Sequence, residues 1–367
     1  MKNYEKDLII EILKFDTNKK KIEDIIKNNN INWPNLLGFI SYHRIAGLVF
    51  EKINNINIRL LEYPVFFSLY MINQAQAIRT HKQLEEIKKI SQKFNENKIK
   101  YVFLKGSVLN QTIFNSGSRA SNDIDILISK NSIQKATKIL NDLGFVQGKY
   151  NYKKDSIEKF DKKTINESVS KIGETCPFIK KSNELTIKTI DVDLNFSLDW
   201  TSEYNQNLIE DILNNSSKIT LEDNTIIYSA NIYDNLIELC IHLYKDMALI
   251  DIITKRKVYD LYKFIDIYYF INTYYDKIDF NKLELEIKKF NAEKYVYFAL
   301  KYLTELFEDI NRDDIISLIN NLEKYIDEPQ ILNVIFDQFN PDKKLISKCT
   351  LKDRIFIYDI IKEYKGE

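Results

Sequence analysis

The segment DIDILIS, residues 123–129, alternates polar and apolar side chains with the period of a β-strand. Side chains two positions apart on a strand share a face, so Asp123 and Asp125 point one way while Ile124 and Ile126 point the other. The isoleucines require burial, and the two carboxylates are held close together on the opposite face. That face meets either water or a cation, and this choice decides what the chain does.

A second motif precedes this strand. Residues 101–104, YVFL, predict a short buried strand, and residues 107–114 predict a short helix capped by Ser107. The turn between them is Lys105-Gly106-Ser107. Glycine lets the backbone approach a ligand closely, and the start of a helix offers unpaired N–H groups to an anion. The turn therefore predicts a phosphate-binding element with a lysine charge and a serine hydroxyl.

A second acidic strand follows later. Residues 184–198 alternate again, and Asp191 and Asp193 share one face. If this strand neighbours the strand of Asp123 and Asp125, its acidic face completes a three-carboxylate cage. Such a cage suits Mg²⁺ or Mn²⁺, because hard cations take oxygen ligands and relieve the repulsion between carboxylates. Asp193 is the expected third ligand, and the choice between it and Asp191 stays open.

Arg119 lies four residues before Asp123, where its guanidinium group is able to pair with phosphate oxygens. Each motif alone has an ordinary interpretation: a solvated strand face, a strand-to-helix turn or a surface charge. Their order, strand, turn, helix, loop, acidic strand, helix, acidic strand, favours one combined metal and nucleotide site.

The rest of the chain predicts an α+β fold that is predominantly helical, with a small mixed sheet between two helical regions. The predicted regions are a helical region over residues 1–98, an α/β core over 99–200 and a helical domain over 201–367. Within the core, residues 146–183 are polar and are expected to form an irregular insertion or a mobile flap.

Charge and cysteine content exclude several classes. Lys+Arg and Asp+Glu both number 53, so there is no basic excess of the kind that grips nucleic acid. The three cysteines form no CxxC pair, which excludes a disulfide framework and a zinc motif. No segment predicts a membrane span or a signal peptide, so we expect a cytoplasmic protein.

Four motifs occur in one order: SYHRIAGLVFEKI, FLKGSVL, SRASNDIDILI and KATKILNDLGF. In this order the chain resembles the nucleotidyltransferase fold of the DNA polymerase β superfamily, and within it the uncharacterised nucleotidyltransferase group. The resemblance implies a sheet with helices on one side, Mg²⁺ and a nucleoside triphosphate donor. The chain departs from the group where Asn195-Phe196 replaces a His-Trp pair after the acidic strand.

Residue roles follow from the resemblance together with the motifs. The catalytic and metal-binding residues are Asp123, Asp125 and Asp193, and the nucleotide-binding residues are Lys105, Gly106, Ser107, Arg119 and Lys245.

The helix over residues 232–250 carries a polar stripe of Asp234, Glu238, His242 and Lys245. His242 is an acceptor-side base or orienting residue that Asp266 would position, Asp191 is a second orienting candidate, and Glu238 is expected on a solvated face.

The resulting hypothesis is an enzyme that moves a nucleoside monophosphate from a triphosphate to a hydroxyl of a small molecule, peptide or protein, releasing pyrophosphate. One alternative keeps the metal site and takes a nucleotide sugar as donor, because DxD pairs also serve glycosyltransferases. Another is a non-catalytic toxin–antitoxin or scaffold protein of the same fold. The sequence does not indicate the acceptor, the base or the oligomeric state.

Overall fold

The computed structural model describes residues 1–57, 59–171, 173–184, 186–198, 205–256, 260–326, 331–337, 344–347 and 349–357. The chain divides into two units, one made of Met1–Asn73 with Leu236–Glu367 and one made of Gln74–Asn235. The two ends of the chain thus belong to the same unit. The long helix α5, Tyr63–Glu96, and the helix α10, Ile232–Ala248, each continue from one unit into the other.

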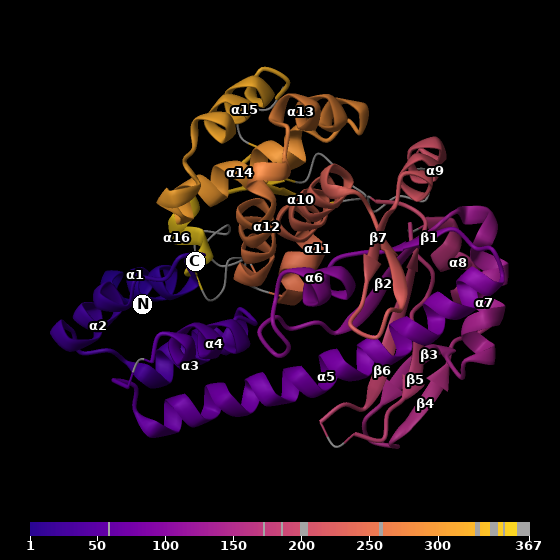
Figure 1. The fold of residues 1–367 in the computed structure, drawn as a ribbon, viewed down its shortest axis with the longest axis horizontal. Coiled ribbons are helices and arrows are strands. Elements are labelled where there is room, and N and C mark those ends of the chain that lie inside the picture. The colour runs from indigo at the N-terminus through magenta and orange to yellow at the C-terminus, as the bar shows by residue number, and fades with distance from the viewer. Residues whose placement is uncertain are drawn as a thin grey trace. The chain divides into compact units, whose positions relative to one another are not determined.

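The first unit is helical (Figure 1). Besides the first turns of α5 and most of α10, its α-helices are α1 Asn3–Leu13, α2 Lys19–Asn28, α3 Trp33–Tyr42, α4 Ala46–Asn55, α11 Ile250–Arg256, α12 Leu261–Tyr274, α13 Phe280–Lys289, α14 Glu293–Leu306, α15 Asp313–Glu323 and α16 Leu351–Ile355. A short antiparallel pair joins β9, Val334–Phe336, to β10, Lys344–Ile346. Within the described ranges, no helix has both the length and the apolar character needed to cross a membrane.

The second unit is built on a mixed sheet. Among the described residues this sheet has eight strands in the order β4-β3-β5-β6-β2-β1-β8-β7. The strands are β1 Tyr101–Phe103, β2 Asp123–Ile128, β3 Val146–Asn151, β4 Ser156–Lys159, β5 Phe178–Lys181, β6 Thr189–Asn195, β7 Ser217–Thr220 and β8 Ile226–Ser229. Its helices are the later part of α5 with α6 Gly106–Thr112, α7 Ile133–Asp142, α8 Lys162–Lys171 and α9 Gln206–Asn214. The predicted α+β, predominantly helical fold is confirmed.

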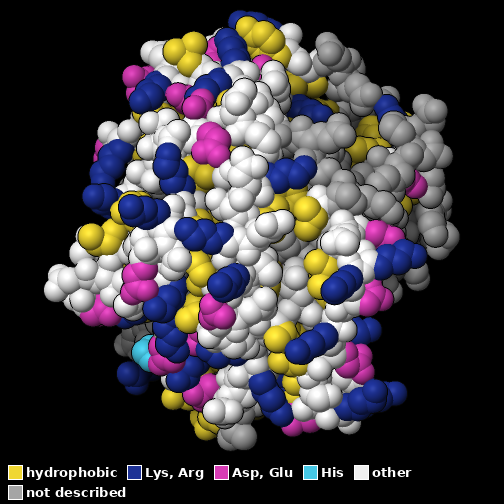
Figure 2. All heavy atoms as spheres, turned by 90° about the vertical axis from the view of Figure 1, so that its right-hand side faces the viewer, with side chains coloured by type: hydrophobic (Ala, Val, Ile, Leu, Met, Phe, Trp, Pro, Cys, Tyr) yellow, Lys and Arg dark blue, Asp and Glu magenta, His cyan; other side chains and the backbone are white. Residues whose placement is uncertain are grey.

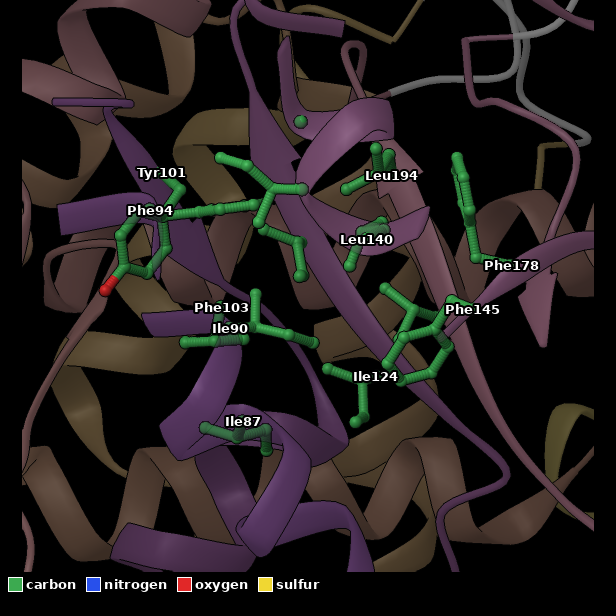
Figure 3. Close-up of a cluster of buried hydrophobic side chains, with 14 of the residues drawn as sticks. Ile87, Ile90, Phe94, Tyr101, Phe103, Ile124, Leu140, Phe145, Phe178 and Leu194 are labelled. Carbon is green, nitrogen blue, oxygen red and sulfur yellow. The ribbon is translucent and has the colours of Figure 1, made fainter. Parts of the chain in front are cut away.

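One face of this sheet carries the hydrophobic core. Ile124 of β2 and Leu194 of β6 are fully buried there, together with Ile90 of α5 and Leu140 of α7 (Figure 3). The helices α5 and α7 therefore cover the isoleucine face of β2, as the alternation in DIDILIS requires. Since alternate residues point to opposite faces, the aspartates of β2 and β6 lie on the other face of the sheet.

Two sequence expectations about local structure are wrong. Residues 146–183, expected to be irregular, form the strands β3, β4 and β5 and the helix α8. The strand β5 pairs with the acidic strand β6. The region after residue 200, expected to be almost entirely helical, contains β7 and β8, and β8 pairs with β1. Both sets of strands extend the sheet towards its edges, and in β3 and β7 the burial does not alternate clearly between the two faces.

Candidate active site

The strands β2 and β6 lie side by side and parallel, which meets the condition set by the sequence. Their register places Asp125 opposite Asp193 and Asp123 opposite Asp191. Directly opposite residues of neighbouring strands project from the same face with Cβ atoms close together. Two pairs of carboxylates, from segments some seventy residues apart in the chain, therefore share one small area of the sheet.

Asp193 has a strongly perturbed pKa. Burial is the largest cause that raises its pKa well above the usual aspartate range, and the charges of Asp123, Asp125 and Glu174 raise it further. The Lys105 ammonium group acts in the opposite direction and lowers this pKa. Negative charge on Asp193 is thus disfavoured unless a cation compensates it.

Asp191, one step outward on the same face, also has a raised pKa because of burial, which Thr189 and Arg79 partly offset. Its buried Oδ1 atom accepts no hydrogen bond from the described residues. A cation would therefore stabilise the charged form of both Asp191 and Asp193, and the pKa of Asp193 is the more strongly raised of the two.

Asp125 is held from three sides. Its carboxylate oxygen Oδ1 lies 2.7 Å from the Nζ atom of Lys105 and accepts a hydrogen bond of 3.3 Å from the side-chain amide of Asn195. Its backbone N–H donates to the hydroxyl oxygen of Ser107 at 3.2 Å, and its carbonyl oxygen accepts from the N–H of Leu104 at 3.0 Å. The turn at residues 104–107 is thereby locked to the middle of β2.

The turn itself is strained. Lys105 precedes α6 as its N-cap residue with φ 48° and ψ −126°, a conformation that side-chain-bearing residues rarely adopt. The prediction that Ser107 caps this helix is wrong: Ser107 lies inside α6 and its hydroxyl group holds β2 instead. Since sparsely populated backbone conformations cluster at functional sites, the strain at Lys105 supports a role for this turn.

Gly106 is required by the packing of Arg119. A Cβ atom at position 106 would stand 2.4 Å from the Nη1 atom of Arg119 and 2.4 Å from the hydroxyl oxygen of Ser121. Arg119 is buried and its guanidinium group lies directly against the turn of Lys105, Gly106 and Ser107. The same group donates to the carbonyl oxygen of Ala120. The structure therefore brings Lys105, Gly106, Ser107 and Arg119 together around the start of α6.

Replacing Gly106 by alanine is therefore expected to destabilise the second unit by about 1–3 kcal/mol, the usual effect of overpacking, and to displace Arg119. The matched control is Gly38→Ala in the helix α3, where an added Cβ meets no atom within 4 Å. This control is expected to be neutral or stabilising, because alanine is the better helix former. Chemical denaturation measures both changes, and equal stability of the two variants would contradict the packing argument.

The family model described as an uncharacterised nucleotidyltransferase matches residues 29–308, which is most of the chain. The chain belongs to the uncharacterised nucleotidyltransferase family. None of the curated proteins matches it. The matched range includes the Lys-Gly-Ser turn and both acidic strands.

The donor set of this family member fits a hard divalent cation in its chemistry. Asp123, Asp125 and Asp193 carry only oxygen donors, and burial together with their mutual repulsion raises the pKa of Asp193. Among the described residues, however, no three His, Cys, Asp or Glu side chains are gathered so that they would hold a metal ion as they stand. Asp125 is instead engaged with Lys105. To hold a metal ion, these side chains would have to rearrange.

The remaining candidate residues lie in the first unit of this nucleotidyltransferase. Lys245 and His242 both belong to α10, and their roles at the nucleotide or the acceptor stay predictions. The Nε2 atom of His242 lies 2.6 Å from the Nζ atom of Lys263, which also forms a buried ion pair with Asp246. An ammonium group only donates hydrogen bonds, so the Nε2 lone pair of His242 is used by Lys263.

Sequence reasoning missed Lys263 and Asp246. Asp246 follows His242 by one helical turn, a spacing that places both on one face of α10 and was the available signal. Glu238, expected on a solvated face, is buried at 3% exposure, and Asp234 is buried at 5%. These two members of the polar stripe are therefore packed against protein, while His242 and Lys245 are half-buried. Asp266 is buried, and His242 contacts Lys263.

Proposed function

We propose that this protein transfers a nucleoside monophosphate from a nucleoside triphosphate to an acceptor hydroxyl group, with release of pyrophosphate and with Mg²⁺ or Mn²⁺ as cofactor. The observation that carries the proposal is the parallel register of β2 and β6, which pairs Asp125 with Asp193 beside the turn of Lys105, Gly106 and Ser107. Family membership supports nucleotidyl transfer as the reaction class. The fold is proposed to be that of the DNA polymerase β superfamily.

Each residue then has a role. Asp123, Asp125 and Asp193 would hold the divalent cation, which supplies charge neutralisation at the triphosphate and polarisation of the reacting phosphorus. Lys105, the backbone at Gly106 and the hydroxyl of Ser107 would bind the β- and γ-phosphates, and Arg119 would bind a non-bridging oxygen.

In the reaction, the acceptor oxygen forms a bond to the α-phosphorus, and the bond from that phosphorus to the bridging oxygen breaks. The electron pair of the broken bond leaves with pyrophosphate. Asp193, on the acidic face beside the reacting atoms, is proposed to take the proton that the acceptor hydroxyl loses. The proposed acid–base step thus needs no residue outside the acidic face.

The acceptor is proposed to be a small molecule, a peptide or a protein. Figure 2 shows Lys and Arg side chains interspersed with Asp and Glu over the face that it draws. The formal net charge of the chain is zero, which does not favour nucleic acid as the acceptor. The roles that the sequence predicts for Lys245 and His242, both on α10, stay predictions.

A nucleotide panel tests this function. We expect at least one of ATP, CTP, GTP and UTP to raise the melting temperature of the protein in Mg²⁺ and to lose this effect in EDTA, because binding to the native state alone stabilises it. UDP-sugars serve as the comparison. Stabilisation by a UDP-sugar without any response to triphosphates would favour the sugar-transfer alternative, and no response to either class would favour a non-catalytic protein.

A further inference from the structure

We propose that Lys105 is a counter-ion lock: in the nucleotide-free protein it occupies Asp125 and keeps free divalent cations out, and it moves to the phosphates when a nucleotide binds. This inference rests on the proposed function and goes beyond it, because it assigns an order of binding. A metal ion would enter with the nucleotide rather than before it.

The ion pair between Lys105 and Asp125 is the first observation. Its Nζ and Oδ1 atoms are 2.7 Å apart, and the two side chains are only 16% and 8% exposed. A pair this sheltered is weakly screened by salt, unlike a surface pair. The Lys105 ammonium group therefore occupies the carboxylate that a metal ion would use, and its positive charge repels such an ion.

The way in which Asp125 is anchored identifies what moves. The backbone of Asp125 is fixed by Ser107 and Leu104, and Asn195 donates to the same Oδ1 atom as Lys105. Release of Lys105 thus leaves Asp125 in place with a hydrogen bond from Asn195. The mobile group is the flexible lysine side chain, which has four carbons between its fixed backbone and its charge.

The proposed phosphate-binding turn beside Lys105 supplies a second position for the charge of the lysine. Lys105 starts the turn whose next residues, Gly106 and Ser107, begin α6, and Arg119 packs against Gly106. A triphosphate bound at this turn would bring several negative charges within reach of the Lys105 ammonium group. The lock therefore opens when the phosphates offer Lys105 more negative charge than Asp125 does.

Lys105→Met tests the lock, because methionine keeps much of the chain length and removes the charge. Mn²⁺ binding is measured by electron paramagnetic resonance, first without nucleotide and then with the nucleotide selected by the panel. Without nucleotide, we expect Lys105→Met to bind Mn²⁺ at least about tenfold more tightly than wild type, since a repelling charge has gone. The same variant is expected to bind the nucleotide more weakly.

These opposite changes separate the lock from damage to the fold, which would weaken both. Lys105→Gly is the second variant, because glycine adopts the positive φ of this position without strain. Lys180→Met is the matched control: it removes another half-buried ion pair of this unit, between Lys180 and Glu86, on the helix-covered face of the sheet. This control is expected to leave Mn²⁺ affinity unchanged.

Unchanged or weaker Mn²⁺ binding by both Lys105 variants, in a protein that still binds Mn²⁺ with nucleotide, would overturn the lock and leave the proposed function standing. Failure of every form to bind Mn²⁺ with any triphosphate would overturn both. Tighter Mn²⁺ binding by Lys105→Met and Lys105→Gly, with Lys180→Met like wild type, would support the lock.

Discussion

Replacing Asp123 by asparagine is expected to lower the Mg²⁺-dependent affinity for the triphosphate by about 100-fold or more. A loss of this size corresponds to about 3 kcal/mol, within the several kcal/mol that a bound metal ion supplies. Asparagine keeps the shape of the side chain and one oxygen but removes the charge that a hard cation requires. Isothermal titration calorimetry in Mg²⁺ and in EDTA measures the effect.

The fold of this variant is expected to persist. The carbonyl oxygen of Asp123 accepts hydrogen bonds from the side chains of Gln83 at 3.3 Å and Ser121 at 3.1 Å, and the substitution leaves both in place. Asp142→Asn, at the exposed end of α7, makes the same change of charge away from the acidic face and is the control. Equal triphosphate affinity in all three proteins would remove Asp123 from the site.

The strands that carry the acids were predictable because each has a strong local pattern. In DIDILIS and in residues 189–195 every second residue is apolar and buried, so period two is visible without any neighbour. The pairing of these two strands with each other was harder to predict. More than sixty residues separate Asp125 from Asp193, and periodicity contains no information about which strands lie side by side.

The missed strands share a physical reason. In β3 the burial alternates poorly and only Gly148 is buried, while in β7 three of four residues are exposed. β7 is an edge strand and β3 lies between β4 and β5, and hydrogen bonds with neighbouring strands hold both of them without a strong apolar face. A local hydrophobic pattern therefore gives no clear sign of either strand.

The contacts of the site depend on backbone geometry that residue types do not encode. Lys105 reaches Asp125 because its own φ is positive and because the turn is tied to β2 by Ser107. Nothing in the spacing of twenty residues predicts this ion pair. The buried Lys263–Asp246 pair likewise joins two helices, α12 and α10, whose approach is a tertiary property.

An acidic face of this kind is costly to the fold when it holds no cation. Asp193 has a native pKa above the aspartate value of the unfolded chain, so the native state binds the proton more tightly than the unfolded state does. The native state then loses stability as pH rises through the native pKa of Asp193, and the full penalty is present above it. Wherever Asp193 is charged in the metal-free protein, its charge opposes folding, and the retained carboxylate is a sign of function.

Asp193→Asn is therefore expected to stabilise the metal-free protein while it removes metal-dependent nucleotide binding. In EDTA at pH 8 we expect a rise in melting temperature of about 2–4 °C, the shift that about 1 kcal/mol produces in a domain of this size. The gain should be smaller at pH 5, because the raised pKa makes the protonated form of wild-type Asp193 more populated there than at pH 8. Differential scanning calorimetry at both pH values measures the difference.

Asp223→Asn is the control of opposite sign. Hydrogen bonds from Lys88 and Thr225 lower the pKa of Asp223 to about 2, so its carboxylate favours the folded state. Its loss is expected to lower the melting temperature slightly and equally at pH 5 and pH 8, since both values lie above its native and unfolded pKa. A melting temperature of Asp193→Asn below that of wild type at pH 8 would contradict the electrostatic account, because it would mean that the charged Asp193 stabilises the metal-free fold.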